Sequence, residues 1–393
     1  MNRTVTEKLA GIITPLYYYD VDLLKKTVET AKSEADKRGY ILHYATKANA
    51  NPKILKIIFA AGFGADCVSG NEILRSVECG VAPALITFAG VGKTDTEINT
   101  GLDNDIFTFN CESIPEMENI DRLAEAKGKT ADISIRINPD VDAKTHEYIS
   151  TGKKENKFGI SAWDFEKVIE KLKILKNLNL ISLHFHVGSQ IMDTSVFVEV
   201  CSRVNSFNQW FKERGFDLEH INVGGGLGID YHTPDKNPIP DFASYFAIFE
   251  QNLKLYPGQK LHFEPGRSIV AQCGSLISRV LYVKEGKTKN FVIVDAGMTD
   301  LIRPALYHAH HHIENLSSNG AQKIYDVAGP ICESADCFDR DVHLPETKRG
   351  DFIALRSAGA YGEVMASQYN LRAIPGSVFS DEIPVKECEI NKI

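Results

Sequence analysis

The chain has 393 residues, of which 43% are hydrophobic and 24% are charged, and its formal net charge at pH 7 is −8. This composition is ordinary for a globular protein, and the length exceeds what one hydrophobic core usually holds, so we expect two domains. The acidic balance leaves no basic stripe for nucleic acid, and the chain has no run of about 18 apolar residues that would predict a membrane span.

Eight short strand-like runs alternate with helical segments along the first two thirds of the chain. Near-continuous apolar runs bounded by Gly, Pro or Asn are typical of parallel strands that are covered on both faces. The predicted strands are 40–47, 63–69, 84–90, 106–110, 132–138, 180–188, 220–226 and 260–266. The predicted helices are 22–37, 51–62, 71–80, 164–175 and 195–215. This alternation predicts an α/β fold, a closed, TIM-like (β/α)₈ barrel over residues 21–270.

The pattern changes near residue 270. Segments 275–297, 321–330 and 351–359 show partial alternation and Gly-rich turns, which predict antiparallel strands with no long helix between them. We expect a β-rich, Greek-key-like domain over residues 271–393. Residues 1–20, which contain the aromatic run TPLYYYD, are expected to contribute a strand to it.

Reactive or anion-binding residues recur at the ends of the predicted strands, where barrels of this kind place their active sites. A role in packing alone does not predict such a placement. The residues at or just beyond strand ends are Lys47, Asp66, His186, Gly224 to Gly226, Glu264 and Arg267.

Lys47 ends the first predicted strand, within YATKAN. A lysine in a barrel mouth is costly to desolvate unless it is paired or used covalently. Desolvation also lowers the pKa of such an amine, which makes it a nucleophile toward aldehydes. Considered alone, Lys47 is better explained as a solvated loop lysine, and it is the surrounding residues that favour a chemical role.

A glycine run, GGGLG, follows the seventh predicted strand. Gly224, Gly225 and Gly226 would let backbone N–H groups approach an anion closely, and loops after strands seven and eight commonly bind phosphate in such barrels. Ser189, within HVGSQ, is a candidate hydroxyl donor to the same anion. The spacing is not GxGxxG, which argues against a Rossmann site; a merely flexible loop is the alternative.

Glu264 lies in EPGR, just after the eighth predicted strand. A carboxylate there could hold the proton on a pyridine nitrogen and so tune a pyridoxal ring, and His186 could stack on that ring. His184 precedes His186 by two residues and would share its strand face, so a pair of metal ligands is the rival interpretation. We expect no metal, because no third ligand with suitable spacing lies nearby.

Three further groups of polar residues follow in the second domain. The run HAHHH at 308–312 is interpreted as a surface or interface segment, because consecutive side chains face different directions. Arg303 and Tyr307 in RPALY suit recognition of a carboxylate, with a surface ion pair as the alternative. Cys332 and Glu333 in GPICES form a polar pair, although a lone Cys is more often an inert hydrophobe.

Cysteine usage and the N-terminus indicate the cellular compartment. The N-terminal residues MNRTVTEKLAGIITPLYYYD have no apolar stretch long enough for a secretory signal. The eight cysteines are residues 67, 79, 111, 201, 273, 332, 337 and 388, with no C-x-x-C pair. We therefore expect a cytoplasmic protein with reduced thiols rather than disulfides or a zinc site.

Seven motifs resemble those of the fold-type III pyridoxal-phosphate decarboxylases, and the resemblance covers nearly the whole chain. In order they are YATKAN, HFHVGSQ, GGGLGI, EPGR, RPALYHAHH, GPICES and SAGAYGEVMASQYN. Within that family the diaminopimelate decarboxylases are the most similar. The resemblance implies a barrel plus a β-domain, pyridoxal 5′-phosphate as the cofactor, and a homodimer whose active sites are shared between subunits.

The resemblance also implies roles for residues around the cofactor ring. Lys47 would bind the cofactor covalently, His186 would stack on its ring, and Glu264 would face the pyridine nitrogen. Asp66 matches a position near the cofactor whose role is left open. Cys332 of the partner subunit would be the acid that protonates the product carbon.

The same resemblance assigns residues to the cofactor phosphate and to the substrate. Ser189 and Gly224 to Gly226 would hold the phosphate, with help from Tyr361 of the partner subunit. The substrate would be bound by Arg267, Arg303, Tyr307, Glu333 and Tyr361.

The implied reaction is decarboxylation of meso-2,6-diaminopimelate to L-lysine and carbon dioxide, the last step of lysine biosynthesis. This substrate carries a second amino-acid head, so Arg267 and Arg303 suit its distal carboxylate and Glu333 its ammonium. Ornithine-type relatives have Asp in the place of Glu333. The alternatives are a polyamine-route decarboxylase acting on carboxynorspermidine, ornithine or arginine, a related racemase, a non-catalytic regulatory homologue, and a phosphate-binding barrel without pyridoxal.

Overall fold

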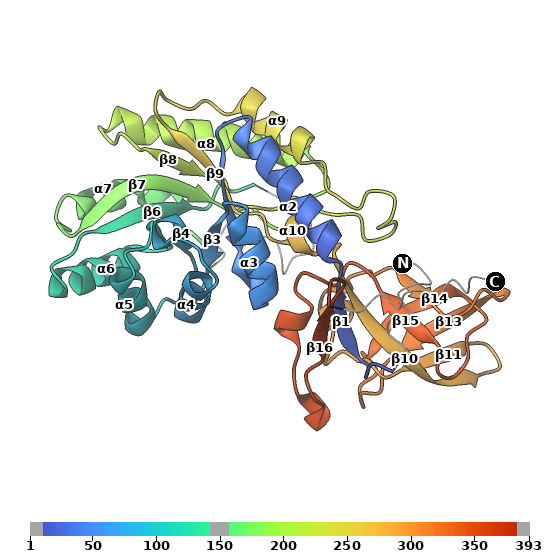
Figure 1. Cartoon of the computed structure of the whole chain (residues 1–393). Coiled ribbons are helices and arrows are strands. Elements are labelled where there is room, and N and C mark those ends of the chain that lie inside the picture. Colours follow the sequence, from blue (N-terminus) through green and yellow to red (C-terminus); the bar gives the residue numbers. More distant parts are fainter. Residues whose placement is uncertain (1–10, 142–156, 383–393) are drawn as a thin grey trace, which may run out of the picture. The chain divides into compact units, whose positions relative to one another are not determined.

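The computed structural model describes residues 11–141 and 157–382, which divide into two compact units (Figure 1). The barrel unit lies within residues 27–229 and 240–269. The strand-rich unit contains residues 11–26, 230–239 and 270–382. Neither unit is a single continuous stretch of chain.

The barrel unit contains a closed barrel of eight parallel strands within the described residues. In chain order they are β2 (Ile41–Ala45), β3 (Gly64–Cys67), β4 (Ile86–Phe88), β5 (Thr108–Cys111), β6 (Ala131–Ile137), β7 (Leu178–Phe185), β8 (His220–Asn222) and β9 (Lys260–Phe263). The first and last strands pair with each other, Ile41 opposite His262 and Leu42 opposite Phe263, and this pairing closes the barrel. Every predicted strand has a counterpart, so the predicted (β/α)₈ barrel is confirmed.

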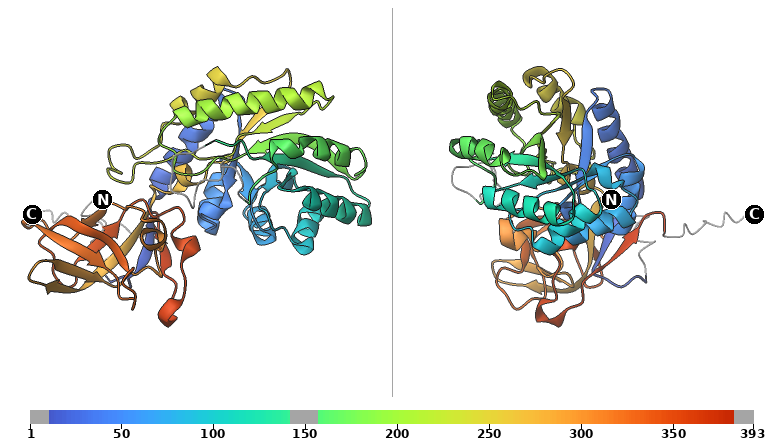
Figure 2. Two further views of the ribbon diagram at one scale, coloured as in Figure 1. Left: turned by 180° about the vertical axis from the view of Figure 1, so that it is seen from behind. Right: turned by 90° about the vertical axis from the view of Figure 1, so that its left-hand side faces the viewer.

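Helices lie on the outside of the barrel strands (Figure 2). They are α2 (Val21–Asp36), α3 (Pro52–Ala60), α4 (Gly70–Glu78), α5 (Asp95–Asp103), α6 (Ile114–Ala126), α7 (Phe165–Leu172), α8 (Ser195–Glu213) and α9 (Phe242–Asn252), and the short α10 (Arg267–Val270) comes after the last barrel strand. The sequence analysis did not single out α5, α6 or α9. Their capping residues were a usable signal: Thr94 and Glu97 form a capping box at α5, and Ser113 caps α6.

Several strands end earlier than predicted, and the site residues follow them in loops. Lys47 lies in the short 3₁₀ helix η1 (Thr46–Ala48) after β2, and His186 and Glu264 come directly after β7 and β9. The glycines at 224–226 likewise follow β8. The carboxyl-terminal rim of the barrel therefore presents these residues from irregular backbone, where binding residues are commonly found.

The strand-rich unit contains one eight-stranded sheet and one short α-helix among its described residues. Its elements are β1 (Leu16–Tyr19), β10 (Gly274–Glu285), β11 (Asn290–Val294), α11 (Arg303–Tyr307), β12 (Ile313–Asn315), β13 (Gln322–Ala328), β14 (Cys337–Pro345), β15 (Phe352–Leu355) and β16 (Gly376–Phe379). The strand order is β12-β15-β10-β11-β13-β14, and β1 pairs with β10 and β16. The predicted second, β-rich domain is confirmed.

One strand pairing differs from the antiparallel arrangement that the sequence predicts: β11 is parallel to β13. β1 is also parallel to β16, a pairing whose direction was not predicted. Parallel neighbours need a crossover connection rather than a tight turn. Between β11 and β13 the chain passes through α11 and β12, which supply that connection. The alternation of residues along a strand carries no information on the direction of its neighbour, so the prediction was wrong here.

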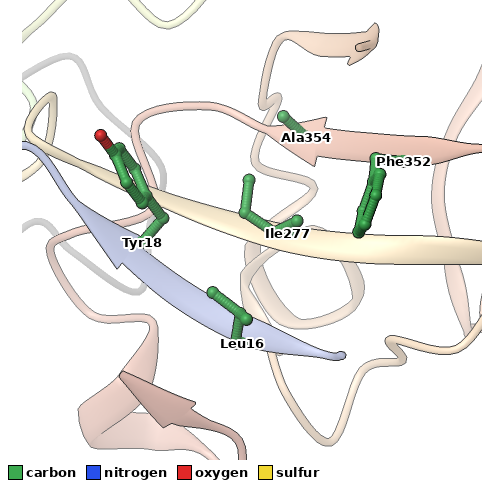
Figure 3. Close-up of a cluster of buried hydrophobic side chains, with 5 residues drawn as sticks. All are labelled: Leu16, Tyr18, Ile277, Phe352 and Ala354. Atoms are coloured by element: carbon green, nitrogen blue, oxygen red, sulfur yellow. The ribbon is translucent and has the colours of Figure 1, made fainter. Parts of the chain in front are cut away.

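A cluster of buried side chains holds β1 in the strand-rich unit (Figure 3). It contains Leu16 and Tyr18 from β1, Ile277 from β10, and Phe352 and Ala354 from β15. Ile277 lies opposite both Leu16 and Ala354 in the sheet register. Burial of this apolar surface adds to the backbone hydrogen bonds in fixing β1.

Replacing Ile277 by alanine should lower the free energy of unfolding by about 2–5 kcal/mol, because the lost methyl groups leave a cavity in a fully buried site. Urea denaturation followed by circular dichroism measures the change. Ile324→Ala on β13 is the matched control, because that isoleucine is 49% exposed. Equal effects of the two substitutions would contradict the assignment of Ile277 to the core.

Candidate active site

A cavity of about 190 Å³ lies among residues at or just beyond the ends of the barrel strands. Its lining comes from segments far apart in the sequence, which the closed barrel brings together. The lining residues are Lys47, Val68, Ala89, Gly90, Arg136, Phe158, His184, His186 and Glu264. Three residues that the sequence analysis selected, Lys47, His186 and Glu264, thus share one cavity.

Lys47 forms an ion pair at this cavity. Its Nζ donates a hydrogen bond to Asp66 Oδ2 at 2.8 Å, and the Asp66 side chain is completely buried. Thr46 holds the turn, because its hydroxyl lies 2.6 Å from Glu72 Oε2 and 3.0 Å from the Asp66 carbonyl oxygen. Burial, with the charge of Glu264, raises the pKa of Asp66 to about 6 despite the opposing effect of Lys47. The structure therefore makes Asp66 the immediate partner of the Lys47 amine.

Glu264 accepts a hydrogen bond on each carboxylate oxygen. His184 Nε2 donates to Oε2 at 2.9 Å, and Asn222 Nδ2 donates to Oε1 at 2.7 Å. Burial alone would raise the pKa of Glu264, but the charge and hydrogen bond of His184, with the charge of Lys47, hold that pKa well below its usual range. The carboxylate is therefore ionised. From the sequence, His184 was predicted only as a possible metal ligand, and Asn222 carried no predicted role.

His186 is a half-buried, uncharged ring beside the glycine run. Its Nδ1 accepts a hydrogen bond from the Gly225 N–H at 3.3 Å. Burial, and then the positive charges of Arg136 and Lys47, hold the pKa of His186 well below its usual range. Arg136 is itself fixed by Glu112 at 2.5 Å. A neutral imidazole in this position can pack against an aromatic ring without the cost of burying a charge.

The glycine run adopts a backbone that other residues could not adopt. Gly224 and Gly226 have φ angles of 70° and 121°, in the left-handed region that favours glycine. A Cβ at Gly224 would come closer than 3.0 Å to the Phe185 carbonyl oxygen, and one at Gly225 equally close to the Glu264 carbonyl oxygen. Close approach of the backbone, rather than flexibility, therefore explains these glycines.

Arg267 and Ser189 lie in direct contact. The guanidinium Nη2 and Nε of Arg267 lie 3.0 and 3.2 Å from Ser189 Oγ, and the arginine is buried. The sequence analysis assigned Ser189 to the cofactor phosphate and Arg267 to the substrate. The structure places both groups at one point, where a cation and a hydroxyl can bind an anion together.

The remaining selected residues lie in the strand-rich unit. Arg303 Nη1 donates to His311 Nε2 at 2.8 Å, His311 Nδ1 donates to the Arg356 carbonyl oxygen at 2.8 Å, and the guanidinium of Arg303 lies over the Tyr231 ring. His311 is only 1% exposed, so of the two predictions for residues 308–312, a surface or an interface segment, the surface one is wrong at this position. His311 is the one buried residue of this run, and it orients the buried Arg303.

Cys332 and Glu333 are exposed and are held by a neighbouring turn. The Cys332 N–H donates to Asn370 Oδ1 at 3.4 Å, and the Tyr369 hydroxyl donates to Glu333 Oε1 at 2.8 Å. Tyr307, at the end of α11, is half-buried. Cys332 thus differs from the buried cysteines of the chain in being accessible to a ligand.

Strand β1 supports the turn that carries Tyr361. The Tyr17 hydroxyl donates to the Asp300 carbonyl oxygen and the Tyr19 hydroxyl donates to Glu363 Oε2, both at 2.6 Å. Tyr361 itself has a φ of 56°, a conformation that costs a non-glycine residue about 1 kcal/mol or more. Tyr19 of the aromatic run therefore holds a residue two positions after Tyr361, whereas Tyr17 fixes the backbone at Asp300.

Three further properties concern the described residues as a whole. Residues 11–141 and 157–382 contain no group of three or more His, Cys, Asp or Glu side chains that could hold a metal ion. No helix in these ranges is long and apolar enough to cross a membrane. Seven cysteines are free thiols, and Cys388 lies outside the described residues.

Comparison with known proteins identifies the family. Residues 21–271 match the family model described as pyridoxal-dependent decarboxylase, pyridoxal binding domain. A diaminopimelate decarboxylase of Bacteroides thetaiotaomicron is 56% identical over 378 residues, which cover 96% of this chain and 98% of that one. The chain belongs to the diaminopimelate decarboxylase family.

Two other diaminopimelate decarboxylases support the membership. The enzyme of Aquifex aeolicus is 41% identical over 375 residues, 95% of this chain and 88% of its own. The crystal structure of the Helicobacter pylori enzyme complexed with L-lysine matches with a TM-score of 0.91 at 41% identity, covering 97% of this chain and 95% of that one.

The residues of the barrel cavity fit the cofactor of this family, pyridoxal 5′-phosphate. The cavity offers an amine at Lys47 and an ionised carboxylate at Glu264, and the glycine run lies next to it. Two buried polar atoms, Asp66 Oδ1 and His184 Nδ1, have no hydrogen-bond partner within the described ranges. Buried polar atoms are rarely left in this state, and a polar ligand in the cavity is one way to satisfy them.

Gly225→Ala should weaken the binding of pyridoxal phosphate to the apoprotein about tenfold or more, because the added methyl group forces the Glu264 backbone away. Titration followed by absorbance measures the affinity. Gly92→Ala is the matched control, since nothing lies within 4 Å of its Cβ position. Equal affinities of the two variants would contradict the assignment of this turn to the cofactor.

Proposed function

We propose that this chain decarboxylates meso-2,6-diaminopimelate to L-lysine and carbon dioxide, with pyridoxal 5′-phosphate as its cofactor. The observation that carries the proposal is the amine of Lys47 in one cavity with the Glu264 carboxylate, in a chain 56% identical to a diaminopimelate decarboxylase. The complex of the Helicobacter pylori relative with L-lysine supports the same product here.

Pyridoxal phosphate, when bound, supplies an electron-accepting ring for the electron pair left when carbon dioxide departs. We propose that Lys47 Nζ holds the cofactor covalently and that Asp66 keeps this amine in position. Glu264 would hold the proton on the ring nitrogen, which requires the ionised carboxylate that its lowered pKa supports. The uncharged His186 would pack on the ring face.

The phosphate of the cofactor would be bound where backbone and side-chain donors converge. Ser189 and the N–H groups of Gly224 to Gly226 are the proposed donors. The contact between Arg267 and Ser189 supports a place for Arg267 beside this phosphate, from which its charge also reaches a substrate carboxylate.

The proposed substrate contacts come from the strand-rich unit. Arg303, oriented by His311, and Tyr307 would bind the distal carboxylate of the substrate, and Glu333 its distal ammonium. Cys332 would deliver a proton from Sγ to the product carbon. Its exposure supports this role, because a buried thiol could not reach a ligand.

We propose that the protein is a homodimer in which Cys332, Glu333 and Tyr361 serve the active site of the partner subunit. The support is a group of exposed apolar side chains within residues 364–374, the segment in which Asn370 Oδ1 accepts a hydrogen bond from the Cys332 N–H. Its members are Val364, Tyr369, Leu371 and Ile374, of which Leu371 is 97% exposed. Exposed apolar patches commonly mark interfaces between proteins.

A cytoplasmic location is part of the proposal. Its support is that the described cysteines are free thiols, including the exposed Cys332. Thiols persist in a reducing compartment, and an acid at this position must stay reduced to carry a proton. Fractionation of cells that express the protein tests the location.

Carbon dioxide release from diaminopimelate tests the function directly. The wild type should turn over diaminopimelate about 10⁴-fold faster than ornithine, because a site built for the distal carboxylate leaves Arg303 unpaired with the shorter amine. Lys47→Ala should abolish release and the borohydride-reducible attachment of the cofactor, while Lys56→Ala on the exposed face of α3 keeps both. Comparable rates on the two substrates would defeat the assignment.

Cys332→Ala should keep the bound cofactor but slow decarboxylation about 10²–10⁴-fold, the usual contribution of a general acid. Cys337→Ala is the control within the same unit. Mixing the inactive Lys47→Ala protein with the slowed Cys332→Ala protein should raise activity above that of either alone, because hybrid dimers regain one intact site. If activity does not rise while subunits exchange, sites are not shared; if Cys332→Ala is fully active, another acid must be sought.

A further inference from the structure

Glu264 is held from both sides by two side chains to which the proposed reaction assigns no role. His184, on β7, and Asn222, on β8, each donate one hydrogen bond, to Oε2 and Oε1 respectively. Both side chains are almost completely buried. The Glu264 carboxylate, just after β9, thus accepts hydrogen bonds from side chains on β7 and β8, the two preceding strands of the barrel.

The chemistry of the three groups fixes the direction of both hydrogen bonds. An ionised carboxylate only accepts, so Nε2 of His184 and Nδ2 of Asn222 must donate. Each carboxylate oxygen has a second lone pair, which stays available to a further donor such as a protonated ring nitrogen. The two hydrogen bonds therefore orient the Glu264 carboxylate and leave it able to accept a further hydrogen bond.

Asn222 has a second contact, which links two parts of the site. Its Oδ1 accepts a hydrogen bond from the Gly224 N–H at 2.9 Å. One side chain therefore joins the Glu264 carboxylate to the first residue of the glycine run. Any movement of that turn is transmitted to the carboxylate, and the reverse.

A role for His184 in packing alone leaves one observation unexplained. Its Nδ1 is buried and has no hydrogen-bond partner in the part of the chain that the structure describes. An unsatisfied buried polar atom destabilises a fold, and a leucine would fill the space without that cost. The charge of His184 is also the largest influence that lowers the pKa of Glu264 against the effect of burial.

We propose that His184 and Asn222 are positioning residues, which hold the Glu264 carboxylate so that it retains the proton on the cofactor ring nitrogen. Asn222 in addition fixes the position of this carboxylate relative to the glycine turn at residues 224–226, which is proposed to bind the phosphate. His184 acts only on the ring-nitrogen end of the cofactor, whereas Asn222 acts on both ends. This inference rests on the proposed function, since it assumes pyridoxal phosphate in the cavity.

The two ends can be tested separately. The holoenzyme, loaded with pyridoxal phosphate labelled with ¹⁵N in its ring, reports the protonation of the nitrogen by NMR, independently of activity. Calorimetric titration of the apoprotein with inorganic phosphate measures the phosphate affinity of the glycine turn at residues 224–226. The variants are His184→Leu and His184→Gln, which remove or keep a donor, and Asn222→Ala and Asn222→Asp, which remove or keep the acceptor for Gly224.

We expect His184→Leu to shift the ¹⁵N resonance toward the unprotonated ring and to lower kcat about 10- to 100-fold, as loss of a hydrogen bond to a charged group does. KM should change less than kcat, and phosphate affinity of the apoprotein should stay unchanged. His184→Gln should lie between wild type and His184→Leu, because the amide still donates a hydrogen bond but carries no charge.

The asparagine variants should separate the two contacts. Asn222→Ala should shift the ¹⁵N resonance and also weaken phosphate binding about 2- to 10-fold, the effect of one neutral hydrogen bond. Asn222→Asp should keep phosphate affinity, since its oxygen still accepts from Gly224. It should shift the ¹⁵N resonance toward the unprotonated ring. A second carboxylate beside Glu264 favours protonation of the carboxylate pair, and a protonated Glu264 holds the ring proton less well.

His220→Gln is the control, a histidine at the opposite end of β8; its spectrum and kinetics should match the wild type.

The inference is overturned if the histidine variants keep the wild-type ¹⁵N shift, or if Asn222→Ala and Asn222→Asp bind phosphate equally. Should His184→Leu fail to fold, the nearly isosteric His184→Gln and Asn222→Asp decide the matter. A wild type that binds the cofactor but releases no carbon dioxide refutes the proposed function instead.

Discussion

Pairing of β2 with β9 closes the barrel, and the contacts of the candidate site depend on that closure. Lys47 follows the first barrel strand and Glu264 the last, so only a closed ring of strands makes them neighbours. Asp66, on the second strand, and His184, on the sixth, then complete the charge balance. A buried charge without its partner destabilises a protein by several kcal/mol, so the same ionic groups that suit the cofactor also favour correct closure.

The two buried carboxylates of the cavity differ in their affinity for protons, and their neighbours explain why. Asp66 has one cationic partner, and burial together with the nearby Glu264 charge raises its pKa to about 6. Glu264 has hydrogen-bond donors on both oxygens, and its pKa is lowered instead. Because their surroundings differ, the Asp66 carboxylate can share a proton with the Lys47 amine, whereas the Glu264 carboxylate stays ionised.

Sequence patterns predicted the eight barrel strands, the change to a β-rich domain, and a cavity that joins Lys47, His186 and Glu264. They worked because apolar runs, turn residues and strand ends are local signals. The parallel direction of β11 and β13, the burial of His311, and the contacts of His184 and Asn222 with Glu264 were not predicted. Each depends on which strands become neighbours and in what register, and a single sequence does not encode this locally.

Strand β1 is the first strand of the chain, yet both of its partners in the sheet, β10 and β16, come in the last third of the sequence. A ribosome adds roughly 5–20 residues per second, so β1 emerges roughly 10–50 seconds before β10 and waits longer still for β16. During translation the aromatic residues of β1 have no sheet to join. The barrel strands, by contrast, can begin to pair as they emerge, which leaves this early segment as the part of the nascent chain that most needs protection by chaperones.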